Sequence, residues 1–512
     1  MRIAFNIATS YARFLTGIIA VIFLTPFTLN MVGVEQFGLW SLCLALTGVL
    51  ALLDAGLSTA AVKYVAECSG NADHHARNEA VSTLMLVYAG LGLICMLAVF
   101  SLIPMGAQLF RLEPQQAEAF NTIMTITGVS LALAFPLSVF RSALIGSGRF
   151  HVVNLVELGC ILLNAALVVT LLSLGWSLTG LAIANASVVL SAPIVLMPLA
   201  KRLIPDFHLG FGLIRLSRMR EVAPLAIYFM LANIALLVTL RSDALIIKAF
   251  LPLSAVAAYA IAAKIGEYTF LLNKQFSNAL MPLVSSSASA GNQHTVRAIL
   301  VDGTRFLMLI ATPLLALLFF YAEHVVTFWV GPELLEVVLP LRILLIAVFF
   351  STLQLNAANV LGMTGGHRGV AFTMVGSALF NIILSLFLIP RFGLAGAAVS
   401  TLAAACLLEF GVMMRRACDQ QAVKQTVVLR GLLPIIVCIV PMLLTAQWLG
   451  SQWAVNGLMD VVWHSAIAVT VFAGIGAFAC IRREERNWII DRIVAVLPVF
   501  TMKRSLTGDQ HG

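Results

Sequence analysis

Apolar runs of about twenty residues, separated by short polar stretches, recur along the whole chain. A helix of this length crosses the roughly 30 Å hydrocarbon core of a membrane. Each run is apolar throughout, whereas the strands of a membrane β-barrel alternate polar and apolar residues. The pattern therefore predicts an all-α polytopic membrane protein with about 14 transmembrane helices. The expected spans lie near residues 11–32, 38–62, 81–104, 119–140, 152–174, 178–199, 223–249, 256–283, 302–328, 337–361, 370–390, 394–414, 431–449 and 461–481.

The composition agrees with this pattern and fixes the orientation. Hydrophobic residues make up 61% of the 512 residues and charged residues 11%, whereas about a quarter of a soluble protein is charged. This excludes a soluble enzyme, a disordered protein and a secreted disulfide scaffold. Most of the 31 lysines and arginines lie at the N-terminus, in the C-terminal tail or in loops after even-numbered spans. Such loops stay in the cytoplasm, so we expect both termini there and interpret the net charge of +8 as a topology signal.

The two halves of the chain resemble each other at a nearly constant offset of 216–219 residues. The segment Val32–Trp40 aligns with Leu251–Tyr259, and Leu178–Ala182 aligns with Leu394–Ala398. Each half holds six predicted spans, so the repeats keep their orientation, as in transporters whose two lobes enclose a central site. The predicted organisation is a six-helix lobe over 1–200, a cytoplasmic linker over 201–222, a second six-helix lobe over 223–415, two appended helices over 416–481 and a cytoplasmic tail over 482–512.

Charged residues inside the predicted spans mark the candidate site. A charge at membrane depth costs at least a few kcal/mol and normally faces a cavity or a partner. In the eighth span, the spacing of Lys264, Glu267 and Lys274 places the three side chains on one helix face. In the seventh span, Arg241 and Lys248 share a face. A short turn joins these two spans, so both faces are expected to line one central cavity.

We interpret this charged group as a cationic cavity that pairs with a diphosphate or with acidic sugars. The substrate-binding candidates are Arg241, Lys264, Lys274, Lys248 and Asn233, and the candidates for ion coupling are Asp54, Glu267 and Asp243. Asp243 points to another face of its helix than Arg241. In the alternative interpretation, Glu267 and Asp243 compensate Lys264 and Arg241 internally. Lys248 and Lys274 then extend to the membrane surfaces.

Other charged residues in or near the spans carry weaker expectations. Asp54 in the second span is interpreted as a protonatable carboxylate or a partner for a basic group, with a structural carboxylate at a helix break as the alternative. Glu157 and Glu409 are expected to be solvated or paired with loop arginines. Arg13 and Arg342 are expected either to face the inner mouth of the cavity or to extend to the membrane surface.

Four segments carry a resemblance to a known family. Gly33–Glu67 contains GVEQFGLWSL and LLDAGLSTAAVKYVAE, and the others are SDALIIKAFLPLSAVAAYAIAAK, NVLGMTGGHR and GLAGAAVST. They resemble the polysaccharide-transporter (oligosaccharide flippase) branch of the multidrug/oligosaccharidyl-lipid/polysaccharide exporter superfamily, in which Asp54 matches a Leu-Asp-x-Gly-Leu motif. The resemblance covers roughly residues 1–415 and implies a bacterial inner-membrane protein. Its two six-helix lobes would be similar to those of the superfamily's multidrug exporters and would alternate between inward- and outward-open states.

The resemblance implies a flippase for undecaprenyl-pyrophosphate-linked oligosaccharides that serves O-antigen, capsule or exopolysaccharide biosynthesis. Its expected partners are the lipid-linked oligosaccharide and membrane lipids, and no nucleic acid is expected. A glycan polymerase and a chain-length regulator are optional further partners. Two alternatives from the same superfamily are a lipid II flippase and a cation-coupled multidrug exporter. An alternative from another class is a membrane-embedded glycosyltransferase or polymerase.

Motifs of enzymes are missing from the sequence. It contains no phosphate-binding loop, no metal-ligand spacing and no long outer loop with an acid–base pair. We therefore expect a transporter without enzymatic activity, cofactor or metal. An H⁺ or Na⁺ gradient, the supply and removal of substrate, or both would then drive transport.

Overall fold

The computed structural model describes residues 2–51, 54, 57–70, 73–215, 217–480 and 485. Within these ranges the chain consists of α-helices with short 3-10 and π-helical segments, and no strand occurs in them. The predicted all-α architecture is therefore confirmed, and it suits a membrane because a helix satisfies its backbone hydrogen bonds internally. Apart from Glu485, the predicted cytoplasmic tail lies outside the described residues.

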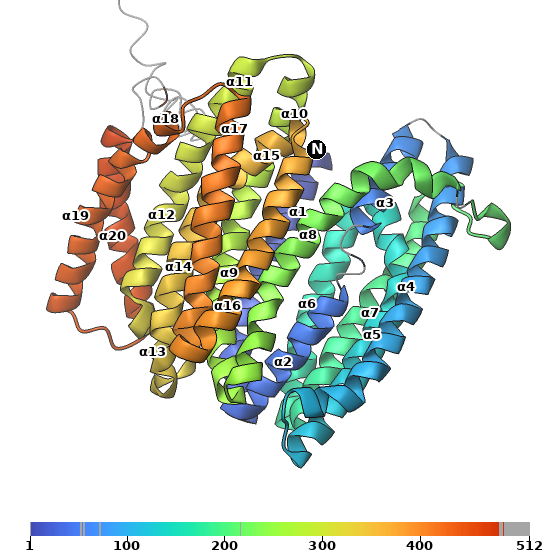
Figure 1. Cartoon of the computed structure of the whole chain (residues 1–512), viewed down its shortest axis with the longest axis horizontal. Helices are drawn as coiled ribbons and strands as arrows, with labels where there is room; N and C mark the ends of the chain where they lie inside the picture. Colours follow the sequence, from blue (N-terminus) through green and yellow to red (C-terminus); the bar gives the residue numbers. More distant parts are fainter. Residues whose placement is uncertain are drawn as a thin grey trace, which may run out of the picture.

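Helices α1 to α7 form the first lobe (Figure 1). Helix α5 lies at its centre, with α3, α4 and α7 packed against it, and α1 packs on α6. The fully buried side chains of Tyr88, Phe120 and Phe140 fill the space between these helices. The bounds are α1 Arg2–Val32, α2 Val34–Leu50, α3 Leu57–Gly70, α4 His74–Leu109, α5 Pro114–Gly146, α6 Phe150–Ser173 and α7 Ser177–Leu203.

The second lobe follows a connection that contains the short helix η2 (Phe211–Leu213). In this lobe α8 packs along α16, and α14 packs against α9, α12 and α16. The bounds are α8 Ser217–Phe250, α9 Leu253–Ala279, α10 Met281–Ser289, α11 Gln293–Ala298, η3 Ile299–Gly303, α12 Thr304–Phe320, α13 Ala322–Val330, η4 Pro332–Val337, α14 Val338–Leu353, α15 Leu355–Met363, α16 His367–Ala404, η5 Ala405–Met414 and α17 Arg415–Gln420.

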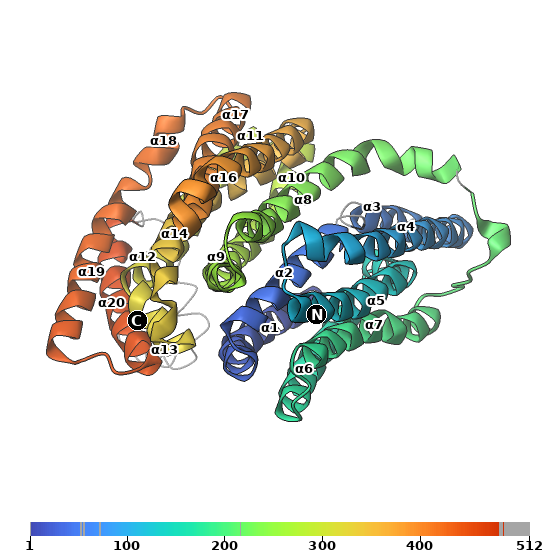
Figure 2. The same cartoon turned by 60° about the horizontal axis from the view of Figure 1, so that its bottom comes forward.

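Three further helices complete the described chain: α18 Gln425–Arg430, α19 Leu433–Gln452 and α20 Leu458–Ala479. Helices α19 and α20 pack on each other and against α12 and α13, at the side of the second lobe that faces away from the first (Figure 2). Beyond α20, Glu485 forms an ion pair with Arg305 near the start of α12. The appended pair is thus attached to the second lobe at both of its ends.

The number of membrane-spanning helices agrees approximately with the prediction. Eleven described helical runs are long and apolar enough to span a membrane, and α2 is a shorter apolar helix. The predicted spans 370–390 and 394–414 form one run that is interrupted at Gly393, where φ is 59°. The chain folds back there, because Ser385 and Ser400 are hydrogen-bonded at 2.5 Å, whereas fifteen residues of straight helix would separate them by about 22 Å.

The predicted span 38–62 needs a correction. Instead of one helix, the structure has α2 ending at Leu50 and α3 beginning at Leu57. Asp54 lies in the turn between them, and its carbonyl accepts hydrogen bonds from the amides of Leu57 and Ser58, which open α3. The apolar composition of this stretch did not reveal the break.

The boundaries of the helices repeat with the offset found in the sequence. Helix α2 begins at Val34 and α9 at Leu253, 219 residues later. Helix α6 begins at Phe150 and α16 at His367, 217 residues later. The internal repeat therefore appears in the structure as helices that start at equivalent positions in the two lobes.

The lobe interface consists of α1, α2 and α3 of the first lobe against α8, α9 and α13 of the second. The lobes come closest at the lower end in Figure 1, the α2/α9 end, and diverge toward the upper tail end, where α1 begins and α20 ends. A Cβ atom on Gly38 would lie 2.0 Å from the carbonyl oxygen of Leu253, so this approach requires glycine. Because Pro26 has no N–H, the carbonyl of Ile22 lacks a helical donor and accepts instead the indole N–H of Trp329 at 2.8 Å.

Replacing Gly38 by valine is expected to push α2 and α9 apart by about 1.5 Å or more. The reason is that non-bonded atoms need roughly 3.5 Å, whereas the added Cβ would start 2.0 Å from Leu253. Double electron–electron resonance between spin labels at Gln115 on α5 and Ser254 on α9 would detect the shift. Gly90→Val is the matched control, because nothing lies within 4 Å of a Cβ at that glycine. An unchanged distance in Gly38→Val would contradict this description of the interface.

Candidate functional site

Arg241 on α8 reaches from the second lobe to the first. It forms an ion pair with Glu267 on α9, with 3.3 Å between Nη2 and Oε1. The aliphatic part of its side chain lies against α2, because a Cβ added to Gly48 would be 3.3 Å from the arginine Cδ. The side chains of Arg241 and Glu267 remain 35% and 20% exposed. Lys264 is a second cation of the second lobe that contacts the first lobe.

Lys264 on α9 also contacts the first lobe. Its Nζ donates a hydrogen bond to Oγ1 of Thr25 on α1 at 3.3 Å. The same ammonium lies 5.4 Å from the centre of the Phe37 ring on α2, which is within the range of a cation–π contact. Together with Arg241 and Glu267, it gives two cations and one carboxylate at the lobe interface. This arrangement leaves a net positive charge where the two lobes meet.

The other substrate-binding candidates lie apart from this group. Lys248 lies about 10 Å farther along α8, toward the α2/α9 end, where Glu35 is its electrostatic neighbour. Lys274 lies about 15 Å farther along α9 and makes no hydrogen bond or ion pair with the part of the chain that the structure describes. Asn233 is half-buried two turns before the arginine of the group. The structure therefore joins two of the five candidates directly to the interface.

Asp243 is buried inside the second lobe, with 5% of its surface exposed. Its carboxylate accepts three hydrogen bonds, from the hydroxyls of Tyr259 on α9 at 2.6 Å, of Thr401 at 3.1 Å and of Ser385 at 3.3 Å, the last two on α16. These hydroxyls satisfy carboxylate lone pairs without adding positive charge. Oxygen atoms from carboxylate and hydroxyl groups are also the ligands of hard cations. The arrangement can hold a proton or a small cation.

Asn381 extends the network around Asp243. Its Nδ2 donates to Oγ1 of Thr401 at 3.1 Å, while its Oδ1 is buried without a hydrogen-bond donor among the described residues. Leaving a buried acceptor unsatisfied costs roughly 1–3 kcal/mol. The sequence named Asp243 but not its hydroxyl partners. Tyr259 and Thr401 nevertheless stand in segments that carry the family resemblance, which is the signal that would have found them.

Asp54 is a half-buried carboxylate of the first lobe, in the turn between α2 and α3. Its electrostatic partners are Tyr88 on α4 and Arg141 on α5. One carboxylate oxygen of Asp54 and the hydroxyl of Tyr88 are buried without a hydrogen bond of normal geometry to a described residue. The residue therefore combines both interpretations made from the sequence, because it lies at the helix break and is also a half-buried carboxylate near a basic group.

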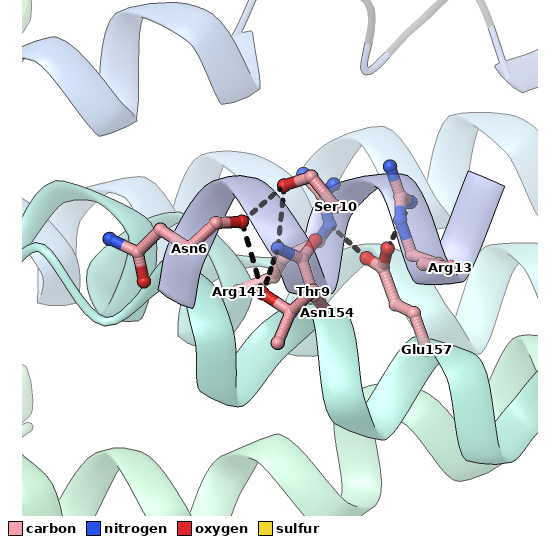
Figure 3. Close-up of polar contacts among 7 residues, drawn as sticks. All are labelled: Asn6, Thr9, Ser10, Arg13, Arg141, Asn154 and Glu157. Carbon is pink, nitrogen blue, oxygen red and sulfur yellow. Dashed lines mark hydrogen bonds and ion pairs between the residues drawn. The ribbon is translucent and has the colours of Figure 1, made fainter. Parts of the chain in front are cut away.

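A second polar cluster lies at the tail end of the first lobe (Figure 3). Arg13 on α1 and Arg141 on α5 both form ion pairs with the carboxylate of Glu157 on α6. Three further residues link α1 and α6 beside them by hydrogen bonds: Thr9, Ser10 and Asn154. The expected pairing of Glu157 with an arginine is present. One of its two arginine partners is Arg13, so the side chain of Arg13 is paired within the first lobe.

The structure corrects the expectation for Glu409 and supplies the partner of Arg342. Glu409 is not paired with a loop arginine, since it lies in the π-helical segment η5 and accepts hydrogen bonds from Ser351 at 2.6 Å and Ser377 at 3.2 Å. Arg342 on α14 packs on α12, where its Nε donates to the carbonyl of Phe319 at 3.2 Å and its guanidinium stacks 5.6 Å from that ring. In both cases a neighbouring helix supplies a partner that a single sequence does not show.

Comparison with protein families identifies the chain. A family model described as polysaccharide biosynthesis protein matches residues 6–288, which is more than half of the chain. The chain belongs to the polysaccharide biosynthesis protein family. A second family model, described as MatE, matches residues 229–387 of the chain. The two matches agree with the superfamily that the sequence motifs resemble.

Curated relatives and solved structures support this assignment. This family member is 21% identical to the membrane protein EpsK of Bacillus subtilis strain 168, over 65% of this chain and 66% of EpsK. It is 27% identical to the probable flippase AglR of Haloferax volcanii, over 31% of this chain and 34% of AglR. The match thus spans less than two thirds of each relative.

The fold is shared with solved members of the same superfamily. Lipid II flippase MurJ in an inward closed conformation superposes with a TM-score of 0.71 at 15% identity, over 93% of this chain and 98% of MurJ. A multidrug resistance MATE family transporter in an inward-facing conformation gives 0.64 at 13% identity, over 80% of this chain and 95% of that one. At these identities the likeness concerns the fold.

Replacing Asp243 by alanine is expected to reduce the free energy of unfolding by roughly 1–3 kcal/mol, because three buried hydroxyl donors lose their shared acceptor. Thermal unfolding of the purified protein in detergent would measure this loss. Ser101→Ala serves as the control, since this hydroxyl lies on the exposed side of α4 and bonds to a carbonyl of its own helix. Its effect should stay within about 0.5 kcal/mol. Equal stability of Asp243→Ala and the unmodified protein would contradict the structural role.

Proposed function

We propose that the chain is a flippase that moves an undecaprenyl-pyrophosphate-linked oligosaccharide across the bacterial inner membrane. The translocated oligosaccharide would serve O-antigen, capsule or exopolysaccharide biosynthesis. The observation that carries this proposal is the group of Arg241, Lys264 and Glu267 at the lobe interface. A pyrophosphate forms strong charge-assisted hydrogen bonds with guanidinium and ammonium groups, and the excess of one cation favours its binding.

In the proposed mechanism of alternating access, the two cations belong to one lobe and their contacts to the other. Arg241 and Lys264 belong to the second lobe, whereas Gly48, Thr25 and Phe37 belong to the first. Any relative movement of the lobes therefore changes the surroundings of both cations, which exchange lobe contacts for contacts with the headgroup. The prenyl tail would remain in the lipid. The bias of lysine and arginine toward the tail-end loops supports a cytoplasmic location for this end.

The buried carboxylates are the proposed sites of ion coupling. Asp243 is surrounded by the hydroxyl oxygens of Tyr259, Thr401 and Ser385, so binding of H⁺ or Na⁺ would compensate its charge. Asp54 in the first lobe and Glu267 at the interface are the other candidates. Because α8 carries both Asp243 and Arg241, two residues apart, a change in the ion site would be transmitted along one helix to the headgroup site.

Lipid II flipping is the second candidate function. The fold likeness to lipid II flippase MurJ extends over almost the whole of that chain, and the interface cations would fit any lipid-linked pyrophosphate headgroup. A cation-coupled multidrug exporter is less favoured, because a net positive site at membrane depth disfavours a cationic drug. Complementation separates these functions, since each predicts rescue of a different deletion strain.

In a strain that lacks this chain and its surface glycan, Arg241→Ala and Lys264→Ala are expected to restore roughly a tenth or less of the normal glycan. Loss of one charged hydrogen bond costs about 1.5–3 kcal/mol, which corresponds to tenfold or more in binding. Quantitative blots of surface polysaccharide, normalised to the amount of inserted protein, would measure this. Lys63→Ala is the control, because Lys63 is 56% exposed on α3, and it should restore normal glycan.

Full restoration by both interface variants would contradict the cationic site. Rescue of a strain depleted of its lipid II flippase, without rescue of the glycan strain, would instead support the second candidate function. The conservative variants Arg241→Lys and Lys264→Arg should retain more activity than the alanine variants, because they keep the charge and change only the hydrogen-bond geometry.

A further inference from the structure

A polar pocket of about 340 Å³ opens at the α2/α9 end of the molecule. The first turns of α2, α5, α7 and α9 form its wall, so residues from both lobes line it. Leu253 is the contribution of the second lobe, and it also makes the close contact with Gly38. The pocket therefore lies at the point where the lobes touch, and separation of α2 and α9 would remove one of its walls.

Hydrogen bonds hold the polar side chains of this pocket in place. Nε2 of Gln116 on α5 donates to Oε1 of Glu35 on α2 at 2.7 Å, while its Oε1 accepts the backbone N–H of Glu113 at 3.1 Å. The hydroxyl of Ser177 on α7 donates to Oε1 of Gln36 at 2.8 Å, which leaves the amide nitrogen of this glutamine available. The side chains of three helices are thus fixed around one space before any ligand enters.

The charge of the lining selects against phosphate. The wall contains the carboxylates of Glu35 and Glu113 but no lysine or arginine. Lys248 is the electrostatic neighbour of Glu35 without lining the pocket. The positive ends of the helix dipoles stabilise the two carboxylates in these first turns, and the carboxylates repel a diphosphate. Carboxylate and amide oxygens accept hydrogen bonds from sugar hydroxyls.

We infer that this pocket binds the uncharged or amino sugars of the oligosaccharide at the α2/α9 end, after the pyrophosphate has left the interface cations. The inference rests on the proposed function, and it adds the class of ligand and the location of a second subsite. In the predicted orientation this end faces away from the cytoplasm. The headgroup would then meet positive charge in the interior, and hydroxyl-binding carboxylate and amide groups at the exit.

The test uses the full chain in lipid nanodiscs. The probe is a phosphate-free oligosaccharide fraction, prepared by partial hydrolysis of the surface polysaccharide of the cells that carry the chain. Saturation-transfer difference NMR detects weak sugar binding and should show transfer to the sugar protons. Gln36→Leu removes an amide of the wall and should weaken binding about fivefold or more, which corresponds to one lost hydrogen bond of roughly 1 kcal/mol.

Matched variants make the result specific. Gln108→Leu is the same substitution at the exposed end of α4, outside the pocket, and should leave binding unchanged. Glu35→Gln is the second pocket variant, in case Gln36→Leu does not fold, and should also weaken binding. Absence of sugar binding to the unmodified chain, or equal binding by Gln36→Leu, Glu35→Gln and Gln108→Leu, would overturn the inference. Binding of Ca²⁺ that Glu35→Gln abolishes and that displaces the sugar would also overturn it, because the pocket would then be a cation site.

Failure of this subsite is distinguishable from failure of the proposed function. Arg241→Ala should lose glycan export and keep binding of the phosphate-free oligosaccharide, because Arg241 does not line the pocket. If Arg241→Ala exported normally while Gln36→Leu lost sugar binding, the cationic site would be wrong and the sugar subsite would stand.

Discussion

The close contact between α2 and α9 is the constraint on which the rest of the structure depends. Gly38 has no side chain, so the backbone of α2 approaches that of Leu253 to a distance that no other residue permits. This approach brings α1 and α2 against the second lobe, where Lys264 meets Thr25 and Phe37. The same contact forms one side of the polar pocket at the α2/α9 end. The two proposed subsites therefore depend on one interface between repeated helices.

Charge is distributed over three environments that have different roles. Two cations and one carboxylate lie at the lobe interface, where movement of the lobes changes their partners. Asp243 is buried among hydroxyl groups of the second lobe, and Asp54 is half-buried in the first lobe near Tyr88 and Arg141. The pocket at the α2/α9 end carries carboxylates without cations in its wall. A pyrophosphate-linked sugar matches this order, because its anionic and hydroxyl-rich parts suit different subsites.

The sequence predicted those features that depend on composition and period. These are the all-helical class, the approximate number of spans, the repeat offset and the presence of facing charges on α8 and α9, although the ion pair that forms joins Arg241 to Glu267. The break at Asp54 stood only as an alternative interpretation, because the flanking residues are apolar on both sides. The sequence also missed Tyr259 and Ser385. Their partners come from other helices, and a single sequence contains no information on which helix faces lie together.

The most direct test of the central claim is a distance measurement between the tail ends of the two lobes. Spin labels at Glu67 on α3 and Gln293 on α11 would report this distance by double electron–electron resonance in the reconstituted protein. The account predicts that a lipid-linked oligosaccharide shifts the distance distribution, and that the double variant Arg241→Ala, Lys264→Ala abolishes the shift. The same distribution with and without the lipid-linked sugar, or an equal shift in the double variant, would contradict it.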